Sequence, residues 1–357
     1  MAAKTPVPPL RVLVIRLSAI GDLIMASGLI PAMHQGWPGA SISWLTDETN
    51  AGLLSANPRV AEVIALPRRR WESLWRARRW RQLGGEVRAF ARDLRARRFD
   101  LVLDVQGLLK SGIWAWLCGA DQRVGLGSRE GSQLLMTRVI SRHVTSDLLG
   151  KEYRAVAGSI GLDPATFAMD IVVGPDDERS AGLALREAGV TSPYAALAPF
   201  TTRPQKHWFD DRWVALAGEA ATLGLRTVVL GGPADGEHGS AIAAGAPAGT
   251  AVSLAGRTSL REAAAVIRGA KLLVGVDTGL THLGFAMGTP TLALFGSTRP
   301  YLDPGVPGGR VLYESMDCSP CRRHPTCHGE FTCMRRHTVE KVADAIRELL
   351  GTTSVAE

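Results

Sequence analysis

Residues 11–22, RVLVIRLSAIGD, constrain the fold more than any other stretch of this chain. The apolar run 12–17 is typical of a buried parallel strand, and the small residues 18–21 predict a turn into a helix that begins near Asp22. Such a turn directs free backbone N–H groups and the positive end of the helix dipole at one point, which suits a phosphate or a functional carboxylate. Asp22 is therefore a candidate functional residue, and its alternative interpretation is an N-cap of the helix.

Strand and helix patterns alternate along the rest of the chain. Apolar runs predict further strands at residues 42–45, 60–66, 100–105, 123–126, 194–200, 227–230, 271–276 and 291–295, the last of which we expect to be the final strand. Because amphipathic helices separate these runs, the sequence predicts an α/β fold with two Rossmann-like, doubly wound parallel sheets that face a cleft.

The stretch Gly-Pro-Asp-Asp at 174–177 is typical of a linker, and the strand-helix pattern restarts after it. We therefore expect an N-terminal domain over 1–174, a C-terminal domain over 175–337, and a C-terminal helix and tail over 338–357. A length of 357 residues favours two domains over one.

Composition argues against a membrane-spanning or secreted protein and favours one with an anionic partner. No run of eighteen apolar residues occurs, which argues against a membrane-spanning helix, and prolines stand within residues 1–10, where a signal peptide needs its apolar segment. We therefore expect a cytoplasmic protein. The net charge of +7 favours an anionic partner, which could be nucleic acid, a phosphorylated lipid or a nucleotide.

The stretch 68–98 is strongly basic, with twelve arginines against three acidic residues. Trp71, Trp75 and Trp80 are interleaved at nearly helical spacing. One interpretation is an exposed, charged helix pair whose tryptophans lie in the core. The other is a basic, aromatic surface that holds a phosphorylated amphiphile at a membrane face.

Further polar residues follow the predicted strands. In the first half, Lys110 follows the turn after strand 100–105 and could reach an anion, and Arg129 lies in the loop after strand 123–126. In the second half, Thr201, Thr202 and Lys206 follow strand 194–200 and could hold a diphosphate.

Two more groups follow later strands. Asp235 and Glu237 follow strand 227–230, where an acidic side chain could accept hydrogen bonds from ribose hydroxyls. Residues 277–282 bring a carboxylate, two hydroxyls, a glycine and a histidine to one strand-helix junction. The alternatives there are a helix cap for Asp277 and a hydrogen-bonded structural histidine for His282.

Four cysteines are closely spaced near the C-terminus, at Cys318, Cys321, Cys327 and Cys333. Four thiolates could close a tetrahedral zinc site that pins a loop, and free thiols are the alternative, because the spacing differs from that of a paired CxxC ribbon. Neither interpretation makes the cluster catalytic.

Four stretches together give a family resemblance: VIRLSAIGD at 14–22, DLVLDVQGLLKS at 100–111, TTRPQKHW at 201–208 and VDTGLTHL at 276–283. With these motifs the chain resembles the heptosyltransferases of bacterial lipopolysaccharide synthesis, glycosyltransferase family 9, which have the two-domain GT-B fold. The resemblance implies transfer of heptose from ADP-heptose, with inversion, to inner-core sugars on lipid A. The acceptor would then be met at the cytoplasmic face of the inner membrane, where the protein could bind peripherally.

The resemblance also implies residue roles. Asp22 would be the general base that deprotonates the acceptor hydroxyl. Donor-binding residues would be Thr201, Thr202, Lys206, Glu237 (or Asp235), Asp277, Thr278, Gly279, Leu280 and His282. Acceptor-binding residues would be Arg68, Arg69, Arg70, Lys110 and Arg129.

Fixed positive groups would stabilise the departing ADP, so we expect no catalytic metal and only a structural zinc, if any. The residues leave open whether the first or the second heptose is added. One alternative is a related transferase that uses another nucleotide sugar or glycan acceptor. An alternative from another class is a basic, zinc-containing nucleic-acid-binding protein, which would leave residues 277–282 without a role.

Overall fold

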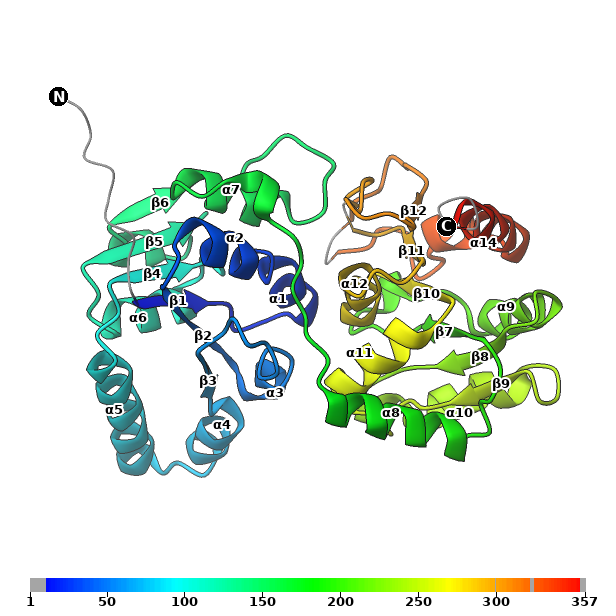
Figure 1. Cartoon of the computed structure of the whole chain (residues 1–357), viewed down its shortest axis with the longest axis horizontal. Helices are drawn as coiled ribbons and strands as arrows, with labels where there is room; N and C mark the ends of the chain where they lie inside the picture. Colours follow the sequence, from blue (N-terminus) through cyan, green and yellow to red (C-terminus); the bar gives the residue numbers. More distant parts are fainter. Residues whose placement is uncertain (1–10, 299, 322–323, 354–357) are drawn as a thin grey trace. The chain divides into compact units, whose positions relative to one another are not determined.

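A computed structural model describes residues 11–298, 300–321 and 324–353, and the chain forms two compact units. Unit 1 contains the described residues up to Ser146 together with Gly150–Val172. Unit 2 contains Asp147–Leu149 and the described residues from Val173 onward. Figure 1 shows that each unit has one central sheet with helices around it, as the sequence predicts.

The sheet of unit 1 has six parallel strands in the order β3-β2-β1-β4-β5-β6. This is the strand order of the Rossmann fold, which reverses between β1 and β4. Its strands are β1 (Arg11–Ile15), β2 (Ser41–Asp47), β3 (Glu62–Leu66), β4 (Leu101–Asp104), β5 (Gln122–Leu126) and β6 (Arg138–Ile140).

Helices on the two faces of this sheet bury the central strands, so Val12 to Ile15 of β1 are inaccessible to solvent. The apolar run predicted for this strand is therefore explained by burial on both faces. The α-helices of unit 1 are α1 (Ile20–Ala26), α2 (Leu29–Gly36), α3 (Glu48–Ala51), α4 (Arg68–Arg76), α5 (Trp80–Ala96), α6 (Leu109–Leu117) and α7 (Lys151–Ser159).

Unit 2 repeats the topology with the order β12-β11-β10-β7-β8-β9, all parallel, and reverses between β10 and β7. Its strands are β7 (Tyr194–Ala198), β8 (Arg226–Val229), β9 (Ala251–Ser253), β10 (Leu272–Val276), β11 (Thr291–Phe295) and β12 (Gly309–Tyr313). Its α-helices are α8 (Pro175–Glu187), α9 (Asp210–Thr222), α10 (Gly236–Gly245), α11 (Leu260–Gly269), α12 (Gly279–Ala286), α13 (Thr332–Arg335) and α14 (Val339–Thr353).

The structure corrects two expectations about element boundaries. The strand at 291–295 is not the last one, because β12 pairs with it in parallel along the edge of the sheet. All of β12 is only partly buried and it contains Arg310, so its sequence lacks the apolar run of a central strand. The expected linker at 174–177 is largely the first turn of α8, with Pro175 at the first helical position.

The tryptophans of the basic stretch divide into two kinds. Trp71 stacks on Trp114 and meets Phe90 edge to face, so the expected core position is confirmed for it. Trp75 and Trp80 are 62% and 47% exposed, so that expectation is wrong for them. Within the described residues, the structure contains no helix that is both long and apolar enough to span a bilayer.

His337 attaches the C-terminal helices to the sheet of unit 2. Its Nε2 hydrogen-bonds to the Phe295 carbonyl at 2.8 Å, and its own carbonyl accepts a hydrogen bond from Trp208 Nε1 at 2.8 Å. The side chain is 2% exposed, and because burial disfavours the charged imidazolium, the pKa of His337 is lowered.

We therefore expect unit 2 to lose stability as the pH falls below 6.5, the ordinary pKa of histidine. Below that pH, His337 is protonated in the unfolded chain but stays neutral in the folded one, which favours unfolding. A His337→Gln variant should lose this part of the pH dependence, measured by urea denaturation across pH 5 to 8. The exposed His34→Gln serves as the control. An unchanged pH dependence in His337→Gln would contradict the assignment.

Candidate active site

The predicted functional residues lie at the carboxyl ends of the strands where each sheet reverses. In unit 1 these strands are β1, which precedes Asp22, and β4, which precedes Lys110. In unit 2 they are β7, which precedes Lys206, and β10, which precedes Asp277. In open α/β sheets the loops that diverge at such a reversal form the ligand site. Each unit therefore presents one candidate site.

Asp22 is the third residue of α1, whose N-cap is Ala19. Its expected N-cap position is therefore wrong, although its carboxylate still accepts a hydrogen bond from the Ala19 backbone N–H at 3.3 Å. A carboxylate at the third position commonly reaches back to the N-cap in this way. The Asp22 side chain is 36% exposed, so part of the carboxylate faces solvent.

Two buried side chains orient the Asp22 carboxylate. Arg16 forms an ion pair with it and also donates a hydrogen bond to the Val105 carbonyl at 2.9 Å, which links the turn after β1 to the end of β4. Tyr153 donates a hydrogen bond to Asp22 Oδ1 at 3.4 Å, and burial raises the pKa of Tyr153, which keeps its hydroxyl protonated. The carboxylate is therefore fixed on one side and open on the other.

The turn after β4 is held by buried Asp104. Its carboxylate accepts hydrogen bonds from the backbone N–H groups of Gln106 and Gly107, both at 3.1 Å, and from the Ser111 hydroxyl at 3.0 Å. Burial raises the pKa of Asp104. The Gln106 amide oxygen accepts a hydrogen bond from the Leu17 N–H at 2.8 Å, so the two turns at the reversal are fixed to each other.

Lys110, in the first turn of α6, and Arg129, in the loop after β5, are both exposed at this edge of the sheet. The Arg129 N–H donates to the Gly107 carbonyl at 3.0 Å, which brings the loop after β5 to the turn that precedes Lys110. Gly107 has a φ of +68°, and a Cβ there would lie 2.1 Å from the Leu126 carbonyl oxygen, so this close approach requires glycine.

The three predicted arginines at the start of α4 are exposed but differ in their contacts. Arg68 pairs with Asp47 at 2.5 Å, at the end of β2, and with Glu72. Arg70 pairs with Glu86 at 3.2 Å. No ion pair involves Arg69 within the described part of the chain, so its guanidinium is available to an anionic ligand.

In unit 2, Lys206 and Asp277 join the loops after β7 and β10 through an ion pair of 2.5 Å. The Thr201 hydroxyl bridges the same loops by donating to the Asp277 carbonyl at 3.5 Å. Although burial alone would raise it, the pKa of Asp277 is lowered, because the Lys206 ammonium and His282 stabilise the carboxylate. A fixed ammonium and a fixed carboxylate therefore lie side by side at the reversal.

Two neighbours of this pair were not expected from the sequence. Thr298 follows β11 and donates a hydrogen bond to Asp277 Oδ2 at 2.7 Å. Tyr301 hydrogen-bonds to His282 Nε2 at 3.0 Å, while His282 Nδ1 bonds to the Thr278 carbonyl at 2.7 Å. The small, polar Gly-Ser-Thr run after strand 291–295 is a sequence signal that could have pointed to Thr298.

The remaining predicted donor residues lie at helix starts. Thr278 is the N-cap of α12, and Gly279 and Leu280 form its first turn, all partly buried. Asp235 accepts a hydrogen bond from the Gly232 N–H at 2.8 Å, so its carboxylate already has a structural role. Glu237 is exposed in the first turn of α10, and Thr202 is exposed in the loop after β7.

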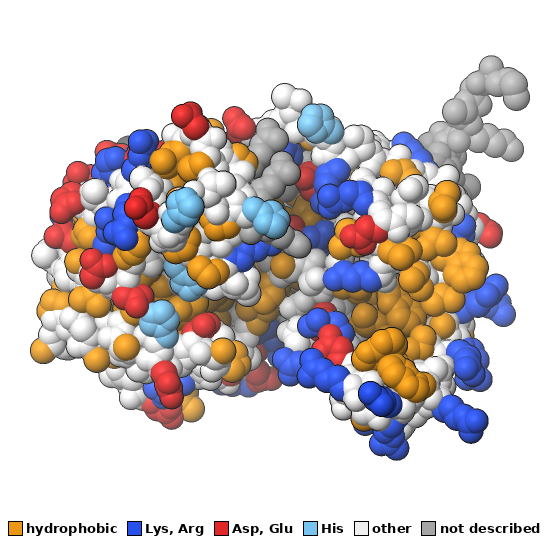
Figure 2. All heavy atoms as spheres, turned by 180° about the vertical axis from the view of Figure 1, so that it is seen from behind, with side chains coloured by type: hydrophobic (Ala, Val, Ile, Leu, Met, Phe, Trp, Pro, Cys, Tyr) orange, Lys and Arg blue, Asp and Glu red, His pale blue; other side chains and the backbone are white. Residues whose placement is uncertain are grey.

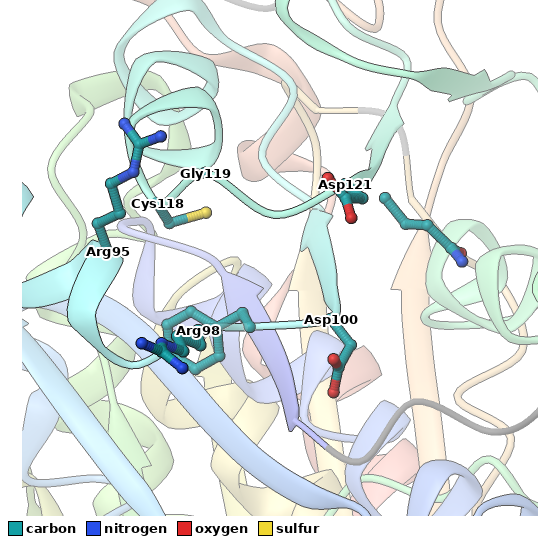
Figure 3. Close-up of a pocket in the computed structure, with 8 residues that line it drawn as sticks. Arg95, Arg98, Asp100, Cys118, Gly119 and Asp121 are labelled. Atoms are coloured by element: carbon teal, nitrogen blue, oxygen red, sulfur yellow. The ribbon is translucent and has the colours of Figure 1, made fainter.

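A separate pocket of about 550 Å³ lies near the opposite, amino-terminal end of β4 and β5, away from these residues. Figure 3 shows Arg95, Arg98, Asp100 and Asp121 around it. The Cys118 thiol at this pocket donates a hydrogen bond to the Ala115 carbonyl at 2.9 Å. Because ligand loops in this fold follow the carboxyl ends of strands, we do not assign this pocket to the active site.

The clustered cysteines are free thiols, with Cys318 exposed, Cys321 and Cys327 partly buried and Cys333 buried. In the described ranges, no group of three or more His, Cys, Asp or Glu side chains is arranged to hold a metal ion. The structure therefore lends no support to the zinc interpretation.

Two Rossmann-like sheets in one chain, each with its candidate loops at the reversal of strand order, form the arrangement known as the GT-B fold. Residues 87–330 match the profile of glycosyltransferase family 9 (heptosyltransferase). The chain belongs to this family and is a glycosyltransferase.

Relatives agree with this assignment. Lipopolysaccharide heptosyltransferase 1 of Pseudomonas aeruginosa is 31% identical, over 95% of this chain and 92% of that protein. The protein of the same name from Salmonella typhimurium is 30% identical, over 87% and 95%. Among solved structures, E. coli heptosyltransferase WaaC with ADP-2-deoxy-2-fluoro heptose superposes with a TM-score of 0.70 at 25% identity, covering 95% of this chain and 99% of that one.

The ion pair of unit 2 gives a testable prediction. Lys206→Met should lower the free energy of unfolding by about 3 kcal/mol, because it leaves the largely buried Asp277 carboxylate unpaired. Adding Asp277→Asn to that variant should restore much of the loss, measured by chemical denaturation. The exposed Lys271→Met is the control. Strictly additive losses in the double variant would show that the two side chains do not stabilise each other.

Proposed function

We propose that this enzyme transfers heptose from ADP-heptose, with inversion, to the inner core of a lipid A-linked lipopolysaccharide acceptor. The observation that carries the proposal is that each unit has a site at its sheet reversal. Unit 1 has an oriented, half-open carboxylate at Asp22, and unit 2 has a fixed ammonium-carboxylate pair at Lys206 and Asp277. The names of the 30–31% identical relatives support heptose as the sugar and lipopolysaccharide as the acceptor.

Asp22 is the proposed general base. As the acceptor oxygen forms its bond to the anomeric carbon, its proton passes to the Asp22 carboxylate, while the bond between that carbon and the diphosphate breaks. Attack from the face opposite the leaving group inverts the configuration. Arg16 and Tyr153 hold the carboxylate, and its exposed side is free to meet the hydroxyl.

Unit 2 is the proposed donor site. Lys206 would balance the charge that develops on the departing ADP. The exposed Thr202 hydroxyl would donate to its phosphates, and so would the Thr201 hydroxyl once it turns from the Asp277 carbonyl. The backbone N–H groups at the start of α12, around Thr278, Gly279 and Leu280, favour an anion in the same way. These fixed positive groups would stabilise the departing ADP without a metal cofactor.

Other donor contacts follow from the geometry. Asp277 would accept a hydrogen bond from a sugar hydroxyl, and the buried His282 would hold the Thr278 backbone in position. Glu237 is the better candidate for the ribose contact, since the Asp235 carboxylate already bonds to Gly232.

The basic residues of unit 1 are proposed to bind the anionic acceptor at the cytoplasmic face of the inner membrane. They are the exposed side chains Arg68, Arg69, Arg70, Lys110 and Arg129. Because Arg68 and Arg70 are already paired with carboxylates, Arg69 would contribute most of the new charge contacts among the three arginines of α4.

Two acceptors test the proposed function. With ADP-heptose as donor, we expect product on lipid A that carries only its inner keto-sugar residues, because the most similar relatives described above are heptosyltransferases 1. Product only on an acceptor that already bears one heptose would instead indicate a second-heptose enzyme. Binding of ADP-heptose without product on either would favour transfer to another glycan.

The Asp22→Asn variant tests the base. It should bind ADP-heptose almost normally, measured by calorimetry, while transfer falls about 100-fold or more. Asp121→Asn, at an exposed aspartate on the opposite edge of the sheet, is the matched control and should transfer normally. Parallel loss of donor binding and transfer in Asp22→Asn would make Asp22 a structural residue.

A further inference from the structure

The positive charge of the chain is concentrated in α4 and α5 and the turn between them. Residues 68–98 hold twelve arginines and three acidic residues, a net charge of +9, whereas the whole chain carries +7, so the remainder carries −2. Figure 2 shows basic side chains gathered around hydrophobic ones over these helices, at the lower right. This segment therefore dominates the attraction of the protein to anions.

The turn between the two helices carries the least neutralised part of this charge. Arg76, Arg78, Arg79 and Arg81 are all exposed. Within the described ranges, none of the four forms an ion pair, whereas Arg68 and Arg70 on α4 and Arg97 just after α5 do. Four guanidinium groups at the turn and the helix ends beside it are therefore available to an external anion.

Two tryptophans accompany these arginines. Trp75 and Trp80 are 62% and 47% exposed and pack edge to face with ring centroids 4.2 Å apart. One helical turn before Trp75 on α4, Trp71 packs on Trp114 and Phe90, which fixes α4 beneath Trp75, while Trp80 begins α5. Large exposed aromatic side chains that cluster in this way mark an interaction surface.

A shallow groove of about 280 Å³ lies beside the pair. Trp71, Trp75 and Leu83 give it a largely apolar lining. Its charged lining residues are Arg68, Arg76 and Glu72, and Glu72 is ion-paired with Arg68. An apolar surface with arginines beside it matches the boundary between lipid headgroups and acyl chains, where tryptophan is enriched and arginine meets phosphate. RNA would also attract the arginines, and its bases could stack on exposed tryptophans, so binding to RNA is one of the outcomes tested below.

We propose that residues 75–81, the turn and adjoining helix ends, dock the enzyme on an anionic phospholipid bilayer. Trp75 and Trp80 would lie at the level of the headgroups, with Arg76, Arg78 and Arg79 on lipid phosphates. The inference deepens the proposed function, because an acceptor linked to lipid A lies in a membrane and a docked enzyme would meet it there.

Vesicle binding tests this surface without donor or acceptor, so its outcome does not depend on the transfer reaction. In a sedimentation assay, the full-length protein should bind vesicles of phosphatidylcholine mixed with phosphatidylglycerol, bind pure phosphatidylcholine far more weakly, and be released by high salt. Arg78→Glu with Arg79→Glu should weaken binding about tenfold or more, and so should Trp75→Ala with Trp80→Ala.

The matched control is Arg179→Glu with Leu183→Ala, an exposed arginine and an exposed leucine on α8 of unit 2, and it should bind like the wild type. The tryptophan variant should keep its circular dichroism spectrum and its transfer to a water-soluble, delipidated acceptor. Equal binding of wild type and both surface variants would overturn the proposal. So would tighter binding to RNA than to anionic vesicles.

Discussion

Burial of the central strands on both faces decides where chemistry can occur in this molecule. Strands β1 and β10 lie between layers of helices, so nearly every side chain along them must be apolar. Charged groups can enter only where these strands end, and the reversal of strand order separates the following loops enough to admit a ligand. Asp22 and Asp277 both occupy such ends, although they lie in different units and 255 positions apart in the sequence.

The same constraint explains which parts of the fold could be predicted. Buried strands appear in the sequence as continuous apolar runs, so β1, β7 and β10 were predicted close to their observed positions. Edge strands β6, β9 and β12 were missed, because one side of each is open and their residues mix polar and apolar types. The start of α1 was misplaced because Ala19, the observed N-cap, carries no capping side chain.

The partners of the candidate residues could not be predicted in the same way. Tyr153 reaches Asp22 across 131 positions of sequence, and Thr298 reaches Asp277 across 21. Such contacts depend on how the chain is wound and leave no periodic pattern in the sequence. Arg16 did leave a signal, because it is the one charged residue within the apolar run 12–17, but that pattern does not identify its partner. The structure shows an ion pair with Asp22.

The hydrogen bonds of His282 have a consequence for the movement of protons. Its Nδ1 faces the Thr278 carbonyl, which can only accept, so this nitrogen must carry the hydrogen. In the neutral ring, Nε2 is then the acceptor for the Tyr301 hydroxyl, whose own pKa is raised by burial. Both ring nitrogens are thus committed to protein partners. His282 therefore has a structural role and a single tautomer. It could relay a proton only by breaking its hydrogen bond to the Thr278 carbonyl, which holds the start of α12.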